Sequence, residues 1–161
     1  MTINQIKKRS SSAEMFVPIK ILDGGRGLAI PQYATPGSAG LDLPAALEGD
    51  LVLKVRERLL IPTGFSVAIP HGYEGQVRSR SGLAYKHGIM VLNSPGTIDS
   101  DYRGELKVLL VNLGEDDFVL ERGMRIAQLV IQKCEQVTLA LVDSLDETDR
   151  AEKGYGSTGV K

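Results

Sequence analysis

Short apolar runs recur along the chain, and residues that favour turns, above all Gly and Pro, separate them. The candidate strands are residues 16–22, 41–43, 51–55, 59–61, 65–69, 74–78, 88–92, 105–112, 117–120, 125–132 and 137–142. Many short strands at a spacing of ~8–12 residues are typical of an all-β sandwich or barrel. No segment keeps a 3.6-residue apolar period, so we expect a single short helix that follows Ser81 and ends at Gly88.

The two ends of the sequence differ in character from its middle. Residues 1–15 are mostly polar and basic, which predicts a disordered N-terminal tail, whereas residues 16–142 carry the strand pattern of one β domain. Residues 143–161 are first acidic and then rich in Gly and Ser, which predicts a flexible C-terminal arm. Within this arm, Arg150 and Tyr155 supply a cation and an aromatic ring.

Composition narrows the partners that the protein can have. Lys and Arg total 19 and Asp and Glu total 20, so we expect no stable nucleic acid partner, while a small anion needs only a few local cations. We also expect no membrane span, because no apolar stretch reaches the ~18–20 residues that one needs. The single cysteine, Cys134, predicts a core thiol and a reducing, cytoplasmic location. His71 and His87 are isolated beside glycines and are expected at the surface.

Residues 93–104 hold the carboxylates that are the best candidates for catalysis. Asp99 and Asp101 are followed directly by Tyr102, and residues 105–112 then form an apolar run that predicts a strand buried on both faces. The acids would therefore lie at the tip of a hairpin, a position that suits a general base. From this stretch alone, two aspartates that cap a turn are the commoner explanation.

A second group of residues could bind an anion. Residues 78–84 place two arginines and two serines directly before the short helix, where Arg80 and the Ser81 hydroxyl would donate to a phosphate. Ser81 could equally be an ordinary N-cap. Asp42 lies in a Gly-rich turn, and Gln128 is a polar residue in an apolar strand, where an outward-facing position is expected. Together these groups suit hydrolysis of a nucleotide phosphoanhydride with a divalent cation.

Five blocks, in order, give this sequence a more specific identity. They are Ala-Gly-Leu-Asp-Leu at 39–43, Arg-Ser-Gly-Leu-Ala at 80–84, Gly-Thr-Ile-Asp-Ser-Asp-Tyr-Arg-Gly at 96–104, Arg-Gly-Met-Arg-Ile-Ala-Gln at 122–128 and Gly-Tyr-Gly-Ser-Thr-Gly at 154–159. From about Val17 onward the chain resembles the trimeric dUTP diphosphatase family. The resemblance implies a β jelly roll, a homotrimer with three sites at subunit boundaries, and Mg²⁺-dependent cleavage of dUTP to dUMP and pyrophosphate. Such an activity keeps dUTP low and supplies dUMP for thymidylate synthesis.

The resemblance also assigns roles around the sugar and the base. Asp99 would activate the water that attacks the α-phosphorus and would touch the 3′-hydroxyl. Tyr102 would pack on the deoxyribose and leave no room for a 2′-hydroxyl. Uracil would pair with backbone or amide groups at or near Asn93, Thr97, Ile98 and Lys107. A thymine methyl would find no space there, and cytosine would present the wrong donors.

The remaining implied roles concern the phosphates. The positions that would hold them, or place the attacking water, are Arg80, Ser81, Gly82 and Gln128. Asp42 would orient hydrated Mg²⁺ through water. The arm would close over a neighbouring subunit's site, with Arg150 on the terminal phosphate and Tyr155 stacked on uracil. Ala151 and Lys153 stand where the family usually has glycine, and Tyr155 stands where it usually has Phe, so the arm has a stiffer backbone here.

Two alternatives remain at this stage. A dCTP deaminase shares the fold, but its catalytic Glu would fall at Leu109, which transfers no protons. The other alternative is a jelly-roll protein that binds a nucleotide without turnover. Asp99 beside Tyr102 argues against such a binder, since binding a polyphosphate gains nothing from a nearby carboxylate.

Overall fold

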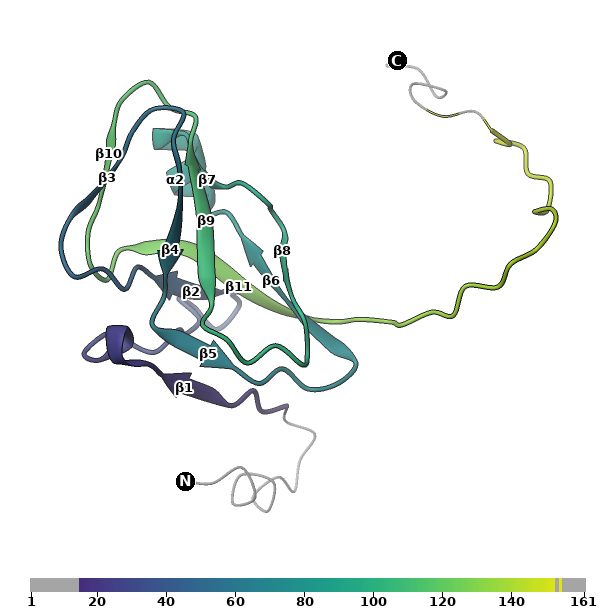
Figure 1. The fold of residues 1–161 in the computed structure, drawn as a ribbon, viewed down its shortest axis with the longest axis horizontal. Helices are drawn as coiled ribbons and strands as arrows, with labels where there is room; N and C mark the ends of the chain where they lie inside the picture. Colours follow the sequence, from purple (N-terminus) through teal and green to yellow (C-terminus); the bar gives the residue numbers. More distant parts are fainter. Residues whose placement is uncertain (1–14, 153, 155–161) are drawn as a thin grey trace.

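The computed structural model describes residues 15–152 and 154, and it is almost entirely built of β-strands (Figure 1). The strands are β1 (Ile19–Ile21), β2 (Leu41–Pro44), β3 (Leu51–Leu53), β4 (Arg58–Pro62), β5 (Phe65–Val67), β6 (Tyr73–Arg78), β7 (Ile89–Val91), β8 (Gly96–Ile98), β9 (Lys107–Asn112), β10 (Phe118–Leu120) and β11 (Arg125–Lys133). A 3₁₀ turn, η1 (Asp23–Gly25), and one helix, α2 (Ser81–His87), complete the described elements. The all-β jelly-roll expectation is therefore confirmed.

Two larger sheets and two strand pairs make up the barrel. The larger sheets have the orders β2-β11-β6-β8 and β4-β9-β7, and the pairs are β1-β5 and β10-β3. Every named pairing is antiparallel. β11 runs across the molecule behind β4 and β9, so strands distant in sequence become neighbours (Figure 1).

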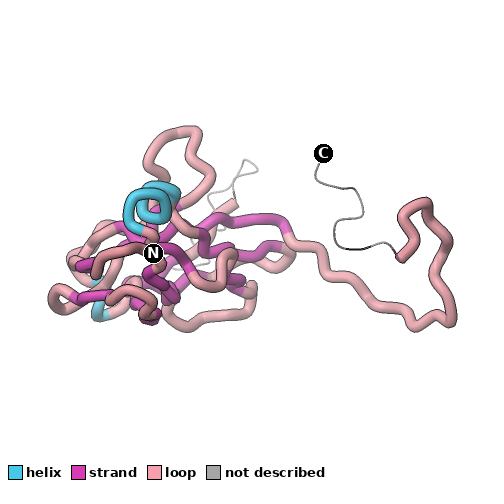
Figure 2. Tube along the Cα trace, turned by 90° about the horizontal axis from the view of Figure 1, so that it is seen from above, coloured by secondary structure: helices cyan, strands magenta, loops and turns pink. Residues whose placement is uncertain are grey.

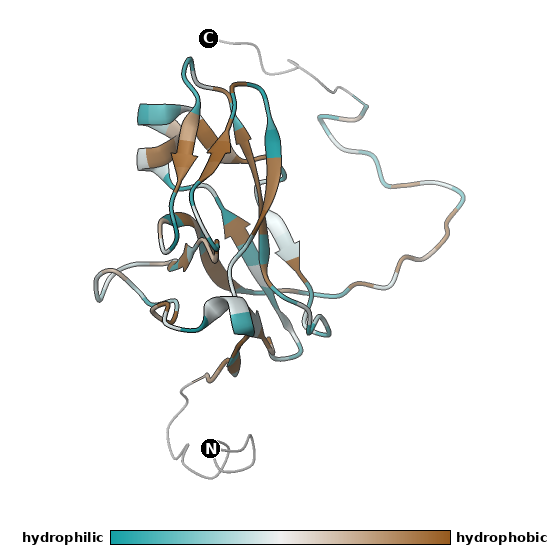
Figure 3. Cartoon of the chain, turned by 60° about the vertical axis from the view of Figure 1, so that its left-hand side comes forward, coloured by the Kyte–Doolittle hydropathy of each residue, from teal (hydrophilic) through white to brown (hydrophobic). Residues whose placement is uncertain are grey.

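The core lies between the two larger sheets. Hydrophobic residues concentrate on the strands, while the loops are mostly hydrophilic (Figure 3). β9 contributes strongly to this core, because Val108, Leu110 and Val111 are all inaccessible or nearly so. The predicted strand forms over Lys107–Asn112, but the expectation of burial on both faces is only partly met, because Lys107 is exposed and Leu109 is half-buried on the second face. Two buried polar side chains of the core are satisfied: Thr63 donates to Leu106 O at 2.7 Å, and Asn112 donates to Leu53 O at 3.0 Å.

The predicted short helix forms, with one difference at its start. α2 begins at Ser81, so the N-cap is Arg80, and its side chain makes no capping bond. Ser81 is therefore the first helical residue, and its interpretation as an N-cap is wrong. The stop is as expected: Gly88 adopts the left-handed conformation at φ 66°, and its N–H returns to Ala84 and Leu83.

The loop that carries Asp99 is not the plain hairpin that the sequence suggested. β8 leaves its sequence neighbours and pairs with β6, whereas β9 pairs with β4 and β7. The hairpin arms are thus β7 and β9, and residues 99–106 connect two different sheets. A local pattern does not specify which strand becomes the partner, since pairing depends on distant residues.

The polypeptide beyond β11 differs from the predictions in two ways. Residues 137–142 form no strand, and the segment after β11 extends away from the body (Figures 1 and 2). Its apolar side chains stay in solvent, with Val137 at 79%, Leu139 at 91% and Leu141 at 103% exposure. Cys134 is half-buried rather than in the core, because it lies just past the end of β11, where its N–H donates to Gly72 O.

Two smaller expectations about exposure and membranes also have outcomes. His71 and His87 are exposed, as predicted, and the His87 ring packs on Phe118 at a centroid distance of 5.0 Å. Within the described part of the chain, no helix has the length and hydrophobicity to cross a membrane.

Candidate functional site

A cleft of about 510 Å³ beside α2 collects most of the residues predicted to hold phosphates. Among its lining residues are Asp42, Arg80, Ser81, Gly82 and Gln128, and we call this site the arginine cleft. These residues come from three separate blocks of the sequence. Their convergence on one cleft agrees with the predicted anion site.

Strand register explains why these distant residues meet. Gln128 of β11 lies opposite Asp42 of β2 on one side and opposite Arg78 of β6 on the other. Gly40 allows the close approach, because a Cβ there would lie 2.4 Å from Gln128 Oε1. Gln128 is partly buried, and its Nε2 donates to Ser79 O at 3.0 Å, so it holds the loop before α2 instead of facing solvent.

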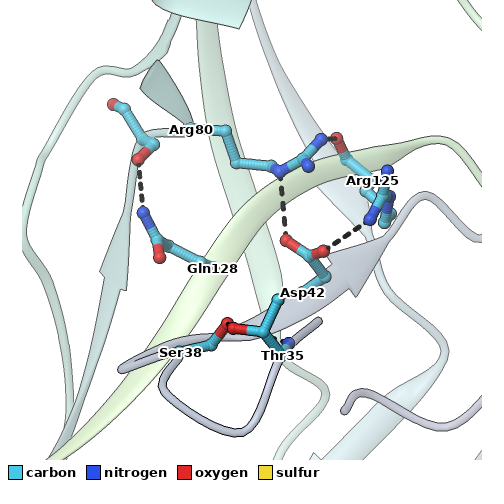
Figure 4. A network of polar contacts seen from close by, with 7 residues as sticks. Thr35, Ser38, Asp42, Arg80, Arg125 and Gln128 are labelled. Carbon is cyan, nitrogen blue, oxygen red and sulfur yellow. Dashed lines mark hydrogen bonds and ion pairs between the residues drawn. The ribbon is translucent and has the colours of Figure 1, made fainter. Parts of the chain in front are cut away.

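Asp42 is the centre of an ion-pair network at the edge of this cleft (Figure 4). Arg80 Nε lies 3.0 Å from Asp42 Oδ1, and Arg125 Nη1 lies 2.9 Å from Asp42 Oδ2. Arg80 Nη1 also donates to the Arg125 carbonyl oxygen at 2.9 Å. Two guanidinium groups therefore engage both oxygens of a single carboxylate, whose exposure is 17%.

The described residues do not fit a protein-built magnesium cage. No group of three or more His, Cys, Asp or Glu side chains in this part of the chain is placed to hold a metal ion. Asp42 has a guanidinium against each oxygen, and a divalent cation next to them would be repelled by both. Mg²⁺ commonly binds through substrate phosphates and waters with few protein ligands, so a metal carried by the substrate requires no such cage.

Asp99 lines a different pocket, of about 690 Å³. Its neighbours there include Tyr73, Glu74, Thr97 and Asp101. The Asp99 carboxylate is exposed, and the Asp99 carbonyl accepts from the Tyr102 N–H at 3.2 Å, which closes a turn. A carboxylate on a short turn after a paired strand is accessible to an outside ligand.

Tyr102 is fixed next to this turn. Its hydroxyl donates to Glu105 O at 3.0 Å, and its side chain remains 42% exposed. Gly104 makes this position possible, because a Cβ at residue 104 would lie 2.3 Å from the Tyr102 hydroxyl. The ring thus presents an exposed, oriented surface within three residues of Asp99.

Within one chain, Asp99 and the arginine cleft lie at opposite ends of β6. Thr97 and Ile98 pair with Gln76 and Gly75, so β8 delivers Asp99 to the beginning of β6. Arg80 follows the other end of the same strand. At about 3.3 Å per residue, the six positions from 74 to 80 correspond to roughly 20 Å. Within one subunit, Asp99 therefore does not reach phosphates that are held at Arg80.

The other predicted residues occupy varied positions. Asn93 and Lys107 are exposed, Ile98 is half-buried, and Lys107 Nζ lies 4.0 Å from Glu105. Arg150 is exposed in the extended segment, while Tyr155 lies outside the described residues. Arg78 contacts Gln76 and Gln132 of the sheet, which fits a structural cation.

Sequence reasoning missed Arg125 as part of the site. It lies within the fourth block, yet its sequence gives no sign that both its side chain and its carbonyl contact the Asp42–Arg80 pair. Arg125 lies beyond the end of the β11–β6 pairing, where its carbonyl is open to the Arg80 side chain, and strand pairing of this kind leaves no signal in the sequence.

The dUTPase family model matches residues 27–159. The chain belongs to the dUTPase family. Two similar curated proteins carry the name deoxyuridine 5′-triphosphate nucleotidohydrolase. The one from Rhizobium etli (strain CIAT 652) is 60% identical over 141 residues, covering 86% of this chain and 90% of that protein. The one from Rickettsia bellii (strain OSU 85-389) is 53% identical over 160 residues, covering 99% of each.

The fold of this dUTPase family member is also found among solved structures. A Staphylococcus bacteriophage 80alpha dUTPase with dUpNHpp superposes with a TM-score of 0.81 at 29% identity, covering 90% of this chain and 99% of that one. The lining residues of the arginine cleft and the Asp99 turn all lie within residues 27–159, so both belong to the matched region.

Proposed function

We propose that this protein hydrolyses dUTP to dUMP and pyrophosphate, keeping dUTP low and supplying dUMP for thymidylate synthesis. The observation that carries the proposal is the convergence of Arg80, Ser81, Gly82 and Gln128 on one cleft in a member of the dUTPase family. The similar phage enzyme with dUpNHpp supports a deoxyuridine triphosphate as the ligand. The single cysteine supports a cytoplasmic location.

The complete site requires more than one subunit. The separation of roughly 20 Å along β6 keeps Asp99 from phosphates in the arginine cleft of its own chain. A homotrimer with sites at subunit boundaries would place Asp99 of one subunit against the cleft of the next. The exposed apolar side chains of residues 137–145 support this assembly, because a neighbouring copy would cover them.

The chemistry divides between these two parts. Arg80 and the Ser81 hydroxyl would donate to the phosphates of a magnesium–dUTP complex, in which the metal offsets part of the triphosphate charge. Asp99 would take a proton from water, the hydroxide oxygen would bond to the α-phosphorus, and the bond from that phosphorus to the bridging oxygen would break. Pyrophosphate leaves with the electron pair of the broken bond.

Selection of the nucleotide would take place around the Asp99 turn. The oriented Tyr102 ring would pack on the deoxyribose, where a 2′-hydroxyl would clash with it. Uracil would pair with backbone groups near Thr97, Ile98 and Lys107 and with the Asn93 amide. Buried groups left unpaired by a wrong base would provide the discrimination.

The C-terminal arm would complete the site. We propose that residues 143–161 reach a neighbouring subunit, with Arg150 on the terminal phosphate and Tyr155 stacked on uracil. The extended path of the described part of this segment supports such a reach (Figure 1). Residues 1–15 would remain an N-terminal tail outside the β domain.

A substrate panel tests the proposal. The protein is incubated with Mg²⁺ and dUTP, dCTP, dTTP or UTP in turn, and pyrophosphate and ammonia are measured. We expect pyrophosphate from dUTP alone. Ammonia from dCTP would indicate a deaminase instead, and binding of dUTP without product would indicate a non-catalytic binding protein.

A further inference from the structure

We propose that Asp42 and Arg125 are positioning residues that aim the Arg80 guanidinium at the substrate phosphates, and that Asp42 does not act on the metal. The inference rests on the proposed function, since it names how that site holds its phosphate-binding arginine. It departs from the expectation that Asp42 orients hydrated Mg²⁺.

The first argument is the charge balance around Asp42. Its carboxylate receives Arg80 Nε at 3.0 Å and Arg125 Nη1 at 2.9 Å, and only 17% of the side chain is exposed. One negative charge between two positive charges leaves the group of three cationic overall. Such a group attracts a triphosphate and repels a divalent cation.

The second argument is geometric. Arg80 is fixed at two points, because Nε contacts Asp42 and Nη1 donates to the Arg125 carbonyl oxygen at 2.9 Å. Two contacts from different nitrogens define the plane of the guanidinium, and the Nη2 group still carries two further N–H donors. Arg80 itself lines the arginine cleft, so this plane is presented at the edge of the phosphate site.

The third argument explains why the Arg125 carbonyl is available. Arg125 lies beyond the pairing of β11 with β6, which ends at Gln128 opposite Arg78. β6 therefore offers no ladder donor to the Arg125 carbonyl, and the side chain of Arg80, which follows β6, supplies the hydrogen bond. Arg125 does not line the arginine cleft, which distinguishes it from a residue that touches phosphate.

The test compares Arg125→Ala, Arg125→Lys and Asp42→Asn with Arg26→Ala as a matched control. Arg26 forms an ion pair of the same length, 2.9 Å, with Asp23 on the surface. Four quantities are measured: the Kd of inorganic tripolyphosphate without metal by calorimetry, the KM and kcat for dUTP, and the Mg²⁺ concentration that gives half of the maximal rate. Thermal melting checks that each variant folds.

We expect Arg125→Ala and Asp42→Asn each to raise the tripolyphosphate Kd and the dUTP KM by about tenfold, or about 1.4 kcal/mol. The half-saturating Mg²⁺ concentration stays unchanged. Combining the two changes adds little to either one, because both act through Arg80. Arg125→Lys, which keeps a cation beside Asp42, recovers part of the loss, and Arg26→Ala behaves like the unaltered protein.

The opposite pattern would overturn the inference. If Asp42→Asn raises the Mg²⁺ requirement and leaves metal-free tripolyphosphate binding unchanged, Asp42 serves the metal. Unchanged tripolyphosphate binding in folded Arg125→Ala would remove Arg125 from its role. Failure of the proposed function looks different: the unaltered protein would then bind tripolyphosphate in the arginine cleft yet release no pyrophosphate from dUTP.

Discussion

At the residue scale, the two aspartates of one turn give a sharp comparison. We expect Asp99→Asn to lower kcat by at least about 100-fold, because the amide takes no proton from water. The Kd of dUTP should change little, since Asn has the same shape, and kinetics with direct binding would separate the two effects. Asp101→Asn, in the same exposed turn, is the control and should keep near-normal kcat. A larger loss of kcat for Asp101→Asn than for Asp99→Asn would show that Asp101, and not Asp99, is the general base.

Individual site residues were predictable from the sequence to the extent that they lie in recognisable blocks. Asp42, Arg80 and Gln128 were all identified, and the structure brings them to one cleft. Their contacts with one another were not predictable. Whether Asp42 faces a metal or two arginines depends on the register of β2 against β11 and on where the pairing of β11 with β6 ends, and the linear order of residues does not specify either one.

At the element scale, α2 and its stop give a prediction about stability. A Cβ at Gly88 would lie 2.3 Å from Gly114 N, and the left-handed φ of 66° adds strain. Gly88→Ala should therefore cost about 2 kcal/mol or more and lower Tm by about 4–8 °C. Gly49→Ala is the matched control, because a Cβ there meets nothing within 4 Å. Equal melting temperatures for the two variants would contradict this account of the helix end.

Elements with strong local signals were predicted correctly, and those whose partner lies elsewhere were not. The long apolar run of β9 and the Ser81-to-Gly88 helix are encoded locally, and both form. Residues 137–142 are a short apolar run that predicts a strand, yet they pair with no strand in the described part of their own chain. Such a composition indicates a preference for pairing as a strand. It does not specify whether the partner strand belongs to this chain or to another.

At the scale of the whole molecule, the separation of Asp99 from the arginine cleft predicts complementation between inactive variants. Asp99→Asn and Arg80→Ala subunits, each inactive alone, are mixed and reassembled. If each site takes Asp99 from one subunit and Arg80 from another, random trimers should recover about a quarter of normal activity, because half of the neighbours supply each intact residue. Either variant reassembled with itself is the control. Mixed trimers that stay inactive would place both residues in one subunit.

The uncovered stretch after β11 has a consequence for handling the protein. Residues 137–142, Val-Thr-Leu-Ala-Leu-Val, contain no charge, proline or glycine, which is the composition that self-associates into cross-β aggregates. A subunit that has dissociated from its neighbours would expose this apolar segment, which could then pair with the same segment of another free subunit. Precipitation after dissociation, rather than loss of the folded barrel, would then limit storage at low concentration.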